Sequence, residues 1–125
     1  MIVLRRRILG RLPARRAQDQ AARGNKYSAA AMKKKWTEYV ALNFANAPRV
    51  DVPVRVIMTW YEPNRRTDPD NIAAAKKFIL DGLQLAGVLK NDGWNEVLGF
   101  IDNFEVDKKN PGVEITLVAR GKEAS

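Results

Sequence analysis

Two aspartates with a spacing suited to metal chemistry stand in the segment RRTDPDN, residues 65–71. Asp68 and Asp70 are expected where a strand gives way to a helix, so that their carboxylates converge. Mg²⁺ prefers such hard oxygen ligands, and water and phosphate usually complete its octahedron. The segment also suits a plain helix start, because Pro69 favours the first helical position and Asp70 complements the helix dipole. Two carboxylates do not decide between these interpretations, and a metal site needs a third.

Asp92 is the best candidate for the third carboxylate. It lies in KNDGW, residues 90–94, just beyond a second predicted helix, where the chain turns back to a strand. An Asp-Gly pair is also common in ordinary turns. The predicted site therefore comprises Asp68, Asp70 and Asp92, and a capping and turn role for the same residues is the alternative.

The composition limits the remaining chemistry. The 125 residues include no Cys and no His, which excludes disulfides, thiolate or imidazole zinc sites, Cys nucleophiles and Ser-His-Asp triads. The net charge is +8, and residues 1–50 contain 12 Lys and Arg but 2 Asp and Glu. This distribution indicates a polyanionic partner such as nucleic acid, because Lys and Arg that neutralise phosphates release counterions. A membrane surface is the weaker alternative.

The first ten residues argue against membrane insertion. Three consecutive Arg residues at 5–7 interrupt their apolar content. No apolar stretch there is long enough for a signal-peptide core or a membrane-spanning helix. We therefore expect a cytoplasmic protein without a membrane partner.

The hydrophobic pattern predicts the elements that must hold these residues. A strand is expected over 1–10, followed by a basic mobile loop over 11–26 that is poorly ordered without DNA. A helix should begin at Ser28 and end before Pro48. Alternating apolar residues predict a strand over 52–61.

The second half of the chain completes the expected fold. A second amphipathic helix should follow Asn71 and stop at Gly87. Two strands, 97–106 and 113–119, should form a hairpin around an Asn-Pro-Gly turn. The order β-α-β-α-β-β predicts one α+β domain, residues 1–125, with a mixed four-stranded sheet and two helices on one face.

The segment TDPDNIAAAKKFILDGLQLAGVLKNDGW, residues 67–94, resembles the RusA family of Holliday junction endonucleases in its phage and prophage form. The shared features are the Asp-x-Asp-Asn core, the Leu-Asp-Gly-Leu helix end, the Ala-Gly-Val step and the Asn-Asp-Gly-Trp turn. The rest of the chain is similar in the order of its elements. The resemblance implies a homodimer that cuts four-way DNA junctions in recombination and repair with Mg²⁺, for which Mn²⁺ is a substitute.

The resemblance also assigns roles to residues. It implies metal binding and catalysis by the three aspartates of the predicted site, and it matches Lys77 to the catalytic lysine. The family often places that lysine one turn after the second aspartate, where this chain has Ala74. Lys76 therefore competes with Lys77, and either would offset charge developing on the scissile phosphate.

Basic residues outside the acidic site are expected to contact DNA phosphates. The predicted DNA-binding residues are Arg15, Arg16, Arg23, Lys26, Arg65, Arg66 and Lys76. The alternative function is a basic nucleic-acid-binding protein without catalysis, in which the aspartates serve only as caps and turns. Both hypotheses require DNA binding, and only the nuclease requires a divalent metal.

Overall fold

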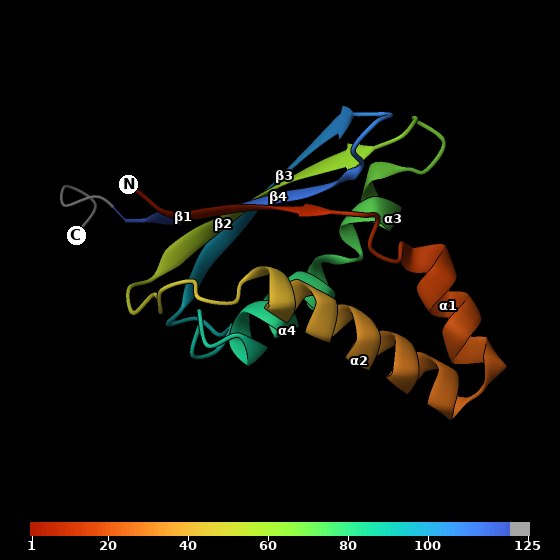
Figure 1. Cartoon of the computed structure of the whole chain (residues 1–125), viewed down its shortest axis with the longest axis horizontal. Helices are drawn as coiled ribbons and strands as arrows, with labels where there is room; N and C mark the ends of the chain where they lie inside the picture. Colours follow the sequence, from red (N-terminus) through yellow and green to blue (C-terminus); the bar gives the residue numbers. More distant parts are fainter. Residues whose placement is uncertain (121–125) are drawn as a thin grey trace.

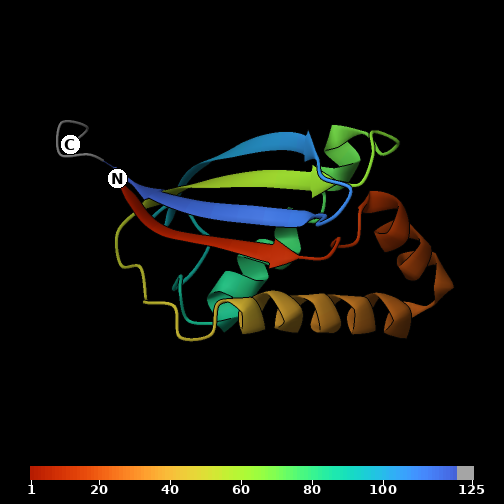
Figure 2. The ribbon, with the colours of Figure 1, turned by 45° about the horizontal axis from the view of Figure 1, so that its top comes forward.

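The structure is a computed structural model that describes residues 1–120, an α+β domain with a mixed four-stranded sheet, as the hydrophobic pattern predicts (Figure 1). Helices α2 and α4 lie against one face of the sheet, and α1 lies at the far end of α2 (Figure 2). In chain order the elements are β1 (Ile2–Leu9), α1 (Arg15–Gly24), α2 (Lys26–Asn43), β2 (Val54–Glu62), α3 (Pro69–Ala73), α4 (Lys76–Leu85), β3 (Val97–Val106) and β4 (Gly112–Ala119).

The sheet has the order β1-β4-β2-β3, and β2 is the strand that organises it. On one side β2 pairs antiparallel with β4, and on the other it pairs parallel with β3, from Val54 opposite Val97 to Glu62 opposite Val106. The predicted hairpin between the last two strands is therefore wrong. The Asn-Pro-Gly sequence does make a turn, but the turn carries the chain across the end of β2 to its opposite side.

That β3–β4 connection is held by Arg7 of β1. The Arg7 guanidinium donates to Asp107 Oδ2 at 2.9 Å and to the Asn110 carbonyl at 2.8 Å. The backbone N–H of Asn110 and the Arg7 guanidinium lower the pKa of the Asp107 carboxyl below its ordinary value. Ionised Asp107 therefore stabilises the loop above the ordinary pKa of aspartate, and this contribution is lost as the pH falls through the lowered pKa.

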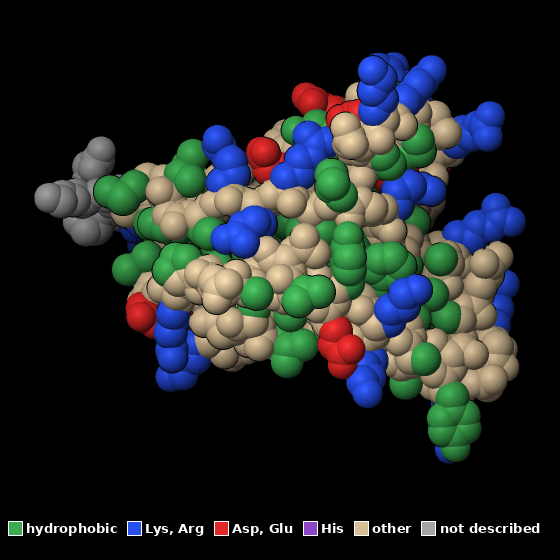
Figure 3. All heavy atoms as spheres, viewed as in Figure 1, with side chains coloured by type: hydrophobic (Ala, Val, Ile, Leu, Met, Phe, Trp, Pro, Cys, Tyr) green, Lys and Arg blue, Asp and Glu red, His purple; other side chains and the backbone are tan. Residues whose placement is uncertain are grey.

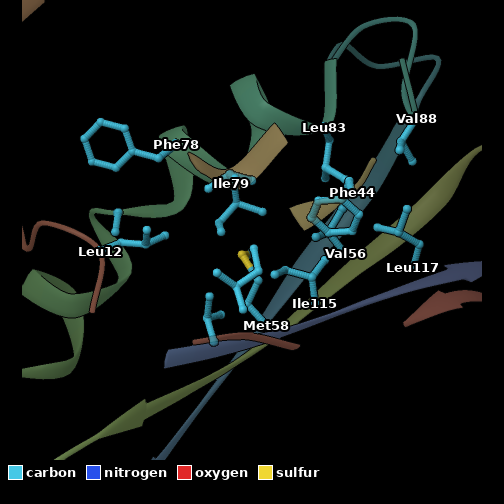
Figure 4. Close-up of a cluster of buried hydrophobic side chains, with 14 of the residues drawn as sticks. Leu12, Phe44, Val56, Met58, Phe78, Ile79, Leu83, Val88, Ile115 and Leu117 are labelled. Carbon is cyan, nitrogen blue, oxygen red and sulfur yellow. The ribbon is translucent and has the colours of Figure 1, made fainter. Parts of the chain in front are cut away.

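The core lies between β2 and β4 and the covering helices. Side chains of β2 alternate as predicted, with Val56, Met58 and Trp60 buried and Arg55 exposed on the opposite face. Figure 4 shows Met58 and the β4 side chains facing Ile79 and Leu83 of α4. A sheet covered by helices on one face requires this two-residue period, because successive side chains of a strand point to opposite faces.

Helices α2 and α4 approach closely at a glycine. A β-carbon placed on Gly82 of α4 would lie 2.6 Å from Val40 Cβ of α2, which is fully buried. Real Cβ atoms essentially never approach so closely. The small residue at position 82 therefore determines how near the two helices come, and with them the packing of α4 on the sheet.

Two helical predictions need correction. The segment 11–26, predicted as a mobile loop, contains α1 and the first residue of α2. Its Arg, Ala and Gln residues have high helix propensity even though few are large and apolar. Helix α2 starts at Lys26 rather than Ser28, because the Asn25 side chain accepts hydrogen bonds from the N–H groups of Tyr27 and Ser28.

The second predicted helix is divided into α3 and α4. The Ala75 N–H donates to the Ile72 carbonyl and the Phe78 N–H to the Ala75 carbonyl, both three residues back. This tighter turn interrupts the α-helical spacing between Ala73 and Lys76. The direction in which a side chain of α4 points therefore does not follow from counting 3.6 residues per turn from α3.

We expect Gly82→Ala to lower the free energy of unfolding despite the higher helix propensity of alanine. Alanine is favoured over glycine in a helix interior by about 1 kcal/mol, whereas overpacking a core costs typically about 1 to 3 kcal/mol. Urea unfolding should therefore show a lower free energy of unfolding for Gly82→Ala than for the unaltered protein. In the background of Val40→Ala, which removes the Cγ1 atom that would lie nearest to the added carbon although it keeps the Cβ, Gly82→Ala should cost less. Equal losses in the two backgrounds would contradict the contact.

Candidate functional site

Asp68 occupies the N-cap position of α3 but does not cap it. Its backbone is extended, with φ −68° and ψ 148°, as expected before Pro69. Its carbonyl accepts from the N–H groups of Asn71 and Ile72, whereas its carboxylate makes no capping hydrogen bond. Asp70 lies in the first turn and is exposed. The carboxylate of Asp68 is therefore available to a ligand.

Asp68 separates two open grooves. The arm groove, about 510 Å³, lies between α1, α2 and the start of α3, and its lining includes Arg11, Arg16 and Arg66. The edge groove, about 630 Å³, lies between the β2–α3 loop and the end of β3, and its lining includes Phe104. Both grooves include Asp68 in their lining. A carboxylate thus stands beside an arginine-lined groove that suits a phosphate chain.

A bidentate ion pair supports the wall between the grooves. Arg11 donates to Glu62 at 2.6 and 3.2 Å, and the Glu62 side chain is largely buried at the end of β2. The pair joins the chain after β1 to the strand that leads into the Asp68 loop. Neither residue was predicted as part of the site, because a contact between positions so far apart in the sequence leaves no local pattern.

The basic arm, residues 15–35, consists of α1 and the first half of α2. Gln18 fastens it to the site by donating to the carbonyls of Pro13 and Ala74. Figure 3 shows Lys and Arg side chains at the right-hand end of the molecule, over the arm and the β2–α3 loop. Of the predicted DNA-binding residues, those exposed on the arm or on this loop are Arg15, Arg16, Arg23, Lys26, Arg65 and Arg66.

Lys76, also predicted to bind DNA, has an internal partner. Its ammonium group lies 2.8 Å from Asp102 Oδ2 of β3 and 4.6 Å from the centre of the Phe100 ring. Trp60 Nε1 donates to the other oxygen of Asp102 at 2.9 Å. The Lys76 and Asp102 side chains are 23% and 21% exposed. Asp102 was not predicted as part of the site, and it ties the start of α4 to the middle of β3.

Lys77 is exposed on α4, with its ammonium group 5.4 Å from the centre of the Phe78 ring. The helix aspartate four residues later, Asp81, lies 3.8 Å from Lys33 of α2. Of the two candidate lysines, the structure thus leaves Lys77 the more accessible.

Asp92 lies at the other end of the sheet from Asp68. It precedes β3 and lies beside Val97, whereas the edge groove at Asp68 includes Val106. The nine steps of strand between those two residues span about 30 Å at the usual rise. Within residues 1–120 no group of three Asp or Glu carboxylates is placed to hold a metal ion. Asp70 follows Asp68 by two residues at the start of α3, whereas Asp92 lies apart from Asp68 within one chain.

The chain matches no protein-family model and no curated protein sequence. In the part of the chain that is described, no helix is long and apolar enough to cross a membrane.

We expect Lys76→Ala to destabilise the fold more than Lys77→Ala. Removing Lys76 leaves Asp102 without its cationic partner, and a hydrogen bond to a charged group contributes about 1.5 to 3 kcal/mol. Lys77→Ala removes an exposed side chain and should lower the free energy of unfolding by about 0.5 kcal/mol or less. Urea unfolding of the two neighbouring variants measures the difference. Equal losses would show that the Lys76–Asp102 pair does not stabilise the fold.

Proposed function

We propose that this protein is a Mg²⁺-dependent endonuclease of the RusA type that hydrolyses phosphodiester bonds in branched DNA such as Holliday junctions. The observation that carries the proposal is the uncapped carboxylate of Asp68 beside a groove lined by arginines. A phosphate bound there meets cations on one side and acidic oxygens on the other. Metal-dependent phosphodiester hydrolysis needs this combination.

The residues fit a magnesium ion in part. Asp68 and Asp70 would supply hard oxygen ligands, and Mn²⁺ would accept the same ones. When bound, the metal would polarise the phosphoryl oxygens and lower the pKa of an attacking water. The third predicted ligand, Asp92, is not beside them in the same chain.

The chain's own basic residues would bind and orient DNA. Arg16 and Arg66 line the groove next to Asp68, and the arm extends the positive surface beyond it. Lys77 is the better candidate to offset charge on the scissile phosphate, because Lys76 is engaged by Asp102. A four-way junction has approximate two-fold symmetry, so a homodimer would make two matched cuts. Such a protein would act in DNA recombination and repair in the cytoplasm.

A basic nucleic-acid-binding protein without catalysis is the second candidate. The separation of Asp92 from Asp68 favours it, because two carboxylates per site are few for a metal-dependent nuclease. Both candidates bind DNA through the arm. They differ in whether Mg²⁺ leads to cutting.

For the nuclease, Asp68→Asn and Asp70→Asn should each reduce Mg²⁺-dependent cutting of a synthetic four-way junction. The loss should be roughly two orders of magnitude or more, as when a group that stabilises transition-state charge is removed. Junction binding without metal should persist or tighten, because a negative charge near phosphate is removed. Glu38→Gln, an exposed charge change on α2, is the matched control and should cut at the parental rate.

The same assay separates the two candidates. Cutting at the parental rate by folded Asp68→Asn and Asp70→Asn proteins would rule out these aspartates as metal ligands. Absence of cutting by the unaltered chain, with tight junction binding, would favour the non-catalytic protein.

For both candidates, replacing Arg15, Arg16 and Arg23 with Gln should weaken binding to all DNA forms. The log-log dependence of affinity on salt should flatten by roughly 0.9 per lost phosphate contact. Fluorescence anisotropy over a salt series measures the slope. The control is a triple Gln variant outside the arm, at Arg5, Arg49 and Arg55, which changes the net charge equally. It should keep the salt slope of the unaltered protein. Identical slopes for the two variants would show that the arm does not contact phosphates.

A further inference from the structure

The arm groove combines an aromatic wall with polar side chains, and the proposed function gives neither a role. Trp36 and Met32, one turn apart on α2, contribute apolar lining. The amide side chains of Gln20 and Asn71 and the hydroxyl of Thr67 also line the groove. Its volume of about 510 Å³ lies within the roughly 300 to 1,000 Å³ usual for small-molecule sites, which also combine apolar walls with a few polar groups. The groove therefore has the size and lining to bind a flat, partly polar molecule.

Trp36 is fixed in its position by its neighbours. Its ring meets the ring of Tyr39 edge to face, with the two centroids 5.6 Å apart. The Tyr39 hydroxyl in turn donates to the Leu9 carbonyl. Trp36 packs against the hydrophobic core and also lines the groove. An aromatic ring held in this way loses little conformational freedom when a ligand stacks on it.

Helix α1 closes the groove although it contributes nothing to the core. None of its ten residues is buried. A helix without a buried apolar face gains little stability from its packing. Even so, α1 is fastened beside α3 by Gln18, and it lines the groove with Arg16, Ala17 and Gln20. A groove that is merely a gap in core packing does not account for this placement of α1.

The charges around the groove favour a ligand that carries phosphate. Three arginines and one aspartate line it. Within residues 1–120, Arg11 is paired with Glu62, whereas neither Arg16 nor Arg66 forms an ion pair with an acidic side chain. Free guanidinium groups suit phosphate oxygens. Aromatic rings stack on the faces of nucleobases, and Asn and Gln amides hydrogen-bond to base edges, so the lining as a whole matches a nucleotide.

A base inside a duplex cannot use this lining, because its neighbours in the stack cover both of its faces. Trp36 can stack only on a base that has left the stack. We propose that the arm groove binds one unpaired nucleotide of branched DNA, with the base against Trp36 and the phosphates on Arg16 and Arg66. The groove then distinguishes a branch point from plain duplex. The proposal rests on the proposed DNA binding, which both candidate functions share, and not on cutting.

Two matched DNA duplexes test the preference. One is fully paired, and the other has a single unpaired thymidine inserted at its centre. Binding is measured by fluorescence anisotropy without Mg²⁺, so that no strand is cut. The parental protein should bind the bulged duplex roughly tenfold more tightly, which is the size expected of one contact between a base and an aromatic ring. Equal affinity for the two duplexes would overturn the proposal.

Two substitutions on α1 test whether the groove causes the preference. Ala17→Leu places a larger side chain in the groove at unchanged charge, and it should abolish the preference while affinity for the paired duplex stays the same. Ala22→Leu, at an exposed position of the same helix outside the groove lining, is the control and should keep the preference. Because α1 buries no residue, both variants should remain folded. Equal preferences in the two variants would contradict a nucleotide site in the groove.

Photo-cross-linking locates the unpaired base. In the bulged duplex the thymidine is replaced with 5-iododeoxyuridine, which on irradiation forms adducts mainly with aromatic and sulfur-containing side chains that it contacts. Mass spectrometry of the digested protein should find the adduct on Trp36 or Met32. Trp94 is 98% exposed and is the accessible competitor. Adducts on Trp94 alone, or none on Trp36 and Met32 when DNA saturates the protein, would overturn the proposal.

The outcomes separate failure of this proposal from failure of the proposed function. A protein that binds neither duplex overturns both candidate functions, and the nucleotide site with them. A protein that binds both duplexes equally, or whose preference is unchanged in Ala17→Leu, overturns the nucleotide site alone. Neither result depends on whether Mg²⁺ leads to cutting.

Discussion

The parallel pairing of β2 with β3 is the constraint on which the rest of the structure depends. Parallel neighbours cannot be joined by a tight turn. The chain that leaves β2 at Glu62 must therefore return to the end of the sheet where β2 begins, before it can enter β3. α3 and α4 make that return and cover the core as they do so. The loop of Asp68 therefore lies at one end of the strands, and the loop of Asp92 lies at the other.

The sequence predicts those parts of the fold that depend on local periodicity. The alternation in β2 and the apolar spacing in α4 identify the core face correctly. The pairing of strands depends on long-range contacts. Turn chemistry at Asn110, Pro111 and Gly112 specifies a reversal, but it does not say which strand β4 will join. The helix α1 was missed because propensity, rather than an apolar face, supports it.

The candidate site likewise has parts that follow from the local sequence and parts that depend on long-range contacts. Asp68 and Asp70 are two residues apart, so their shared place at the start of α3 and the extended backbone before Pro69 follow from local geometry. The engagement of Lys76 by Asp102 could not be predicted, because it joins α4 to a strand beyond the next loop. The placement of Asp92 was predictable in principle. Once β3 is parallel to β2, the loop before it cannot lie beside the loop after β2.

Separation of the acids has an electrostatic consequence. Three carboxylates gathered in one chain repel one another unless a cation is bound, and this repulsion would oppose folding. Because Asp92 lies at the opposite end of the sheet from Asp68, a single chain folds without that added repulsion. One chain therefore offers at most Asp68 and Asp70 to a Mg²⁺ ion, so water and phosphate oxygens would have to complete its octahedron.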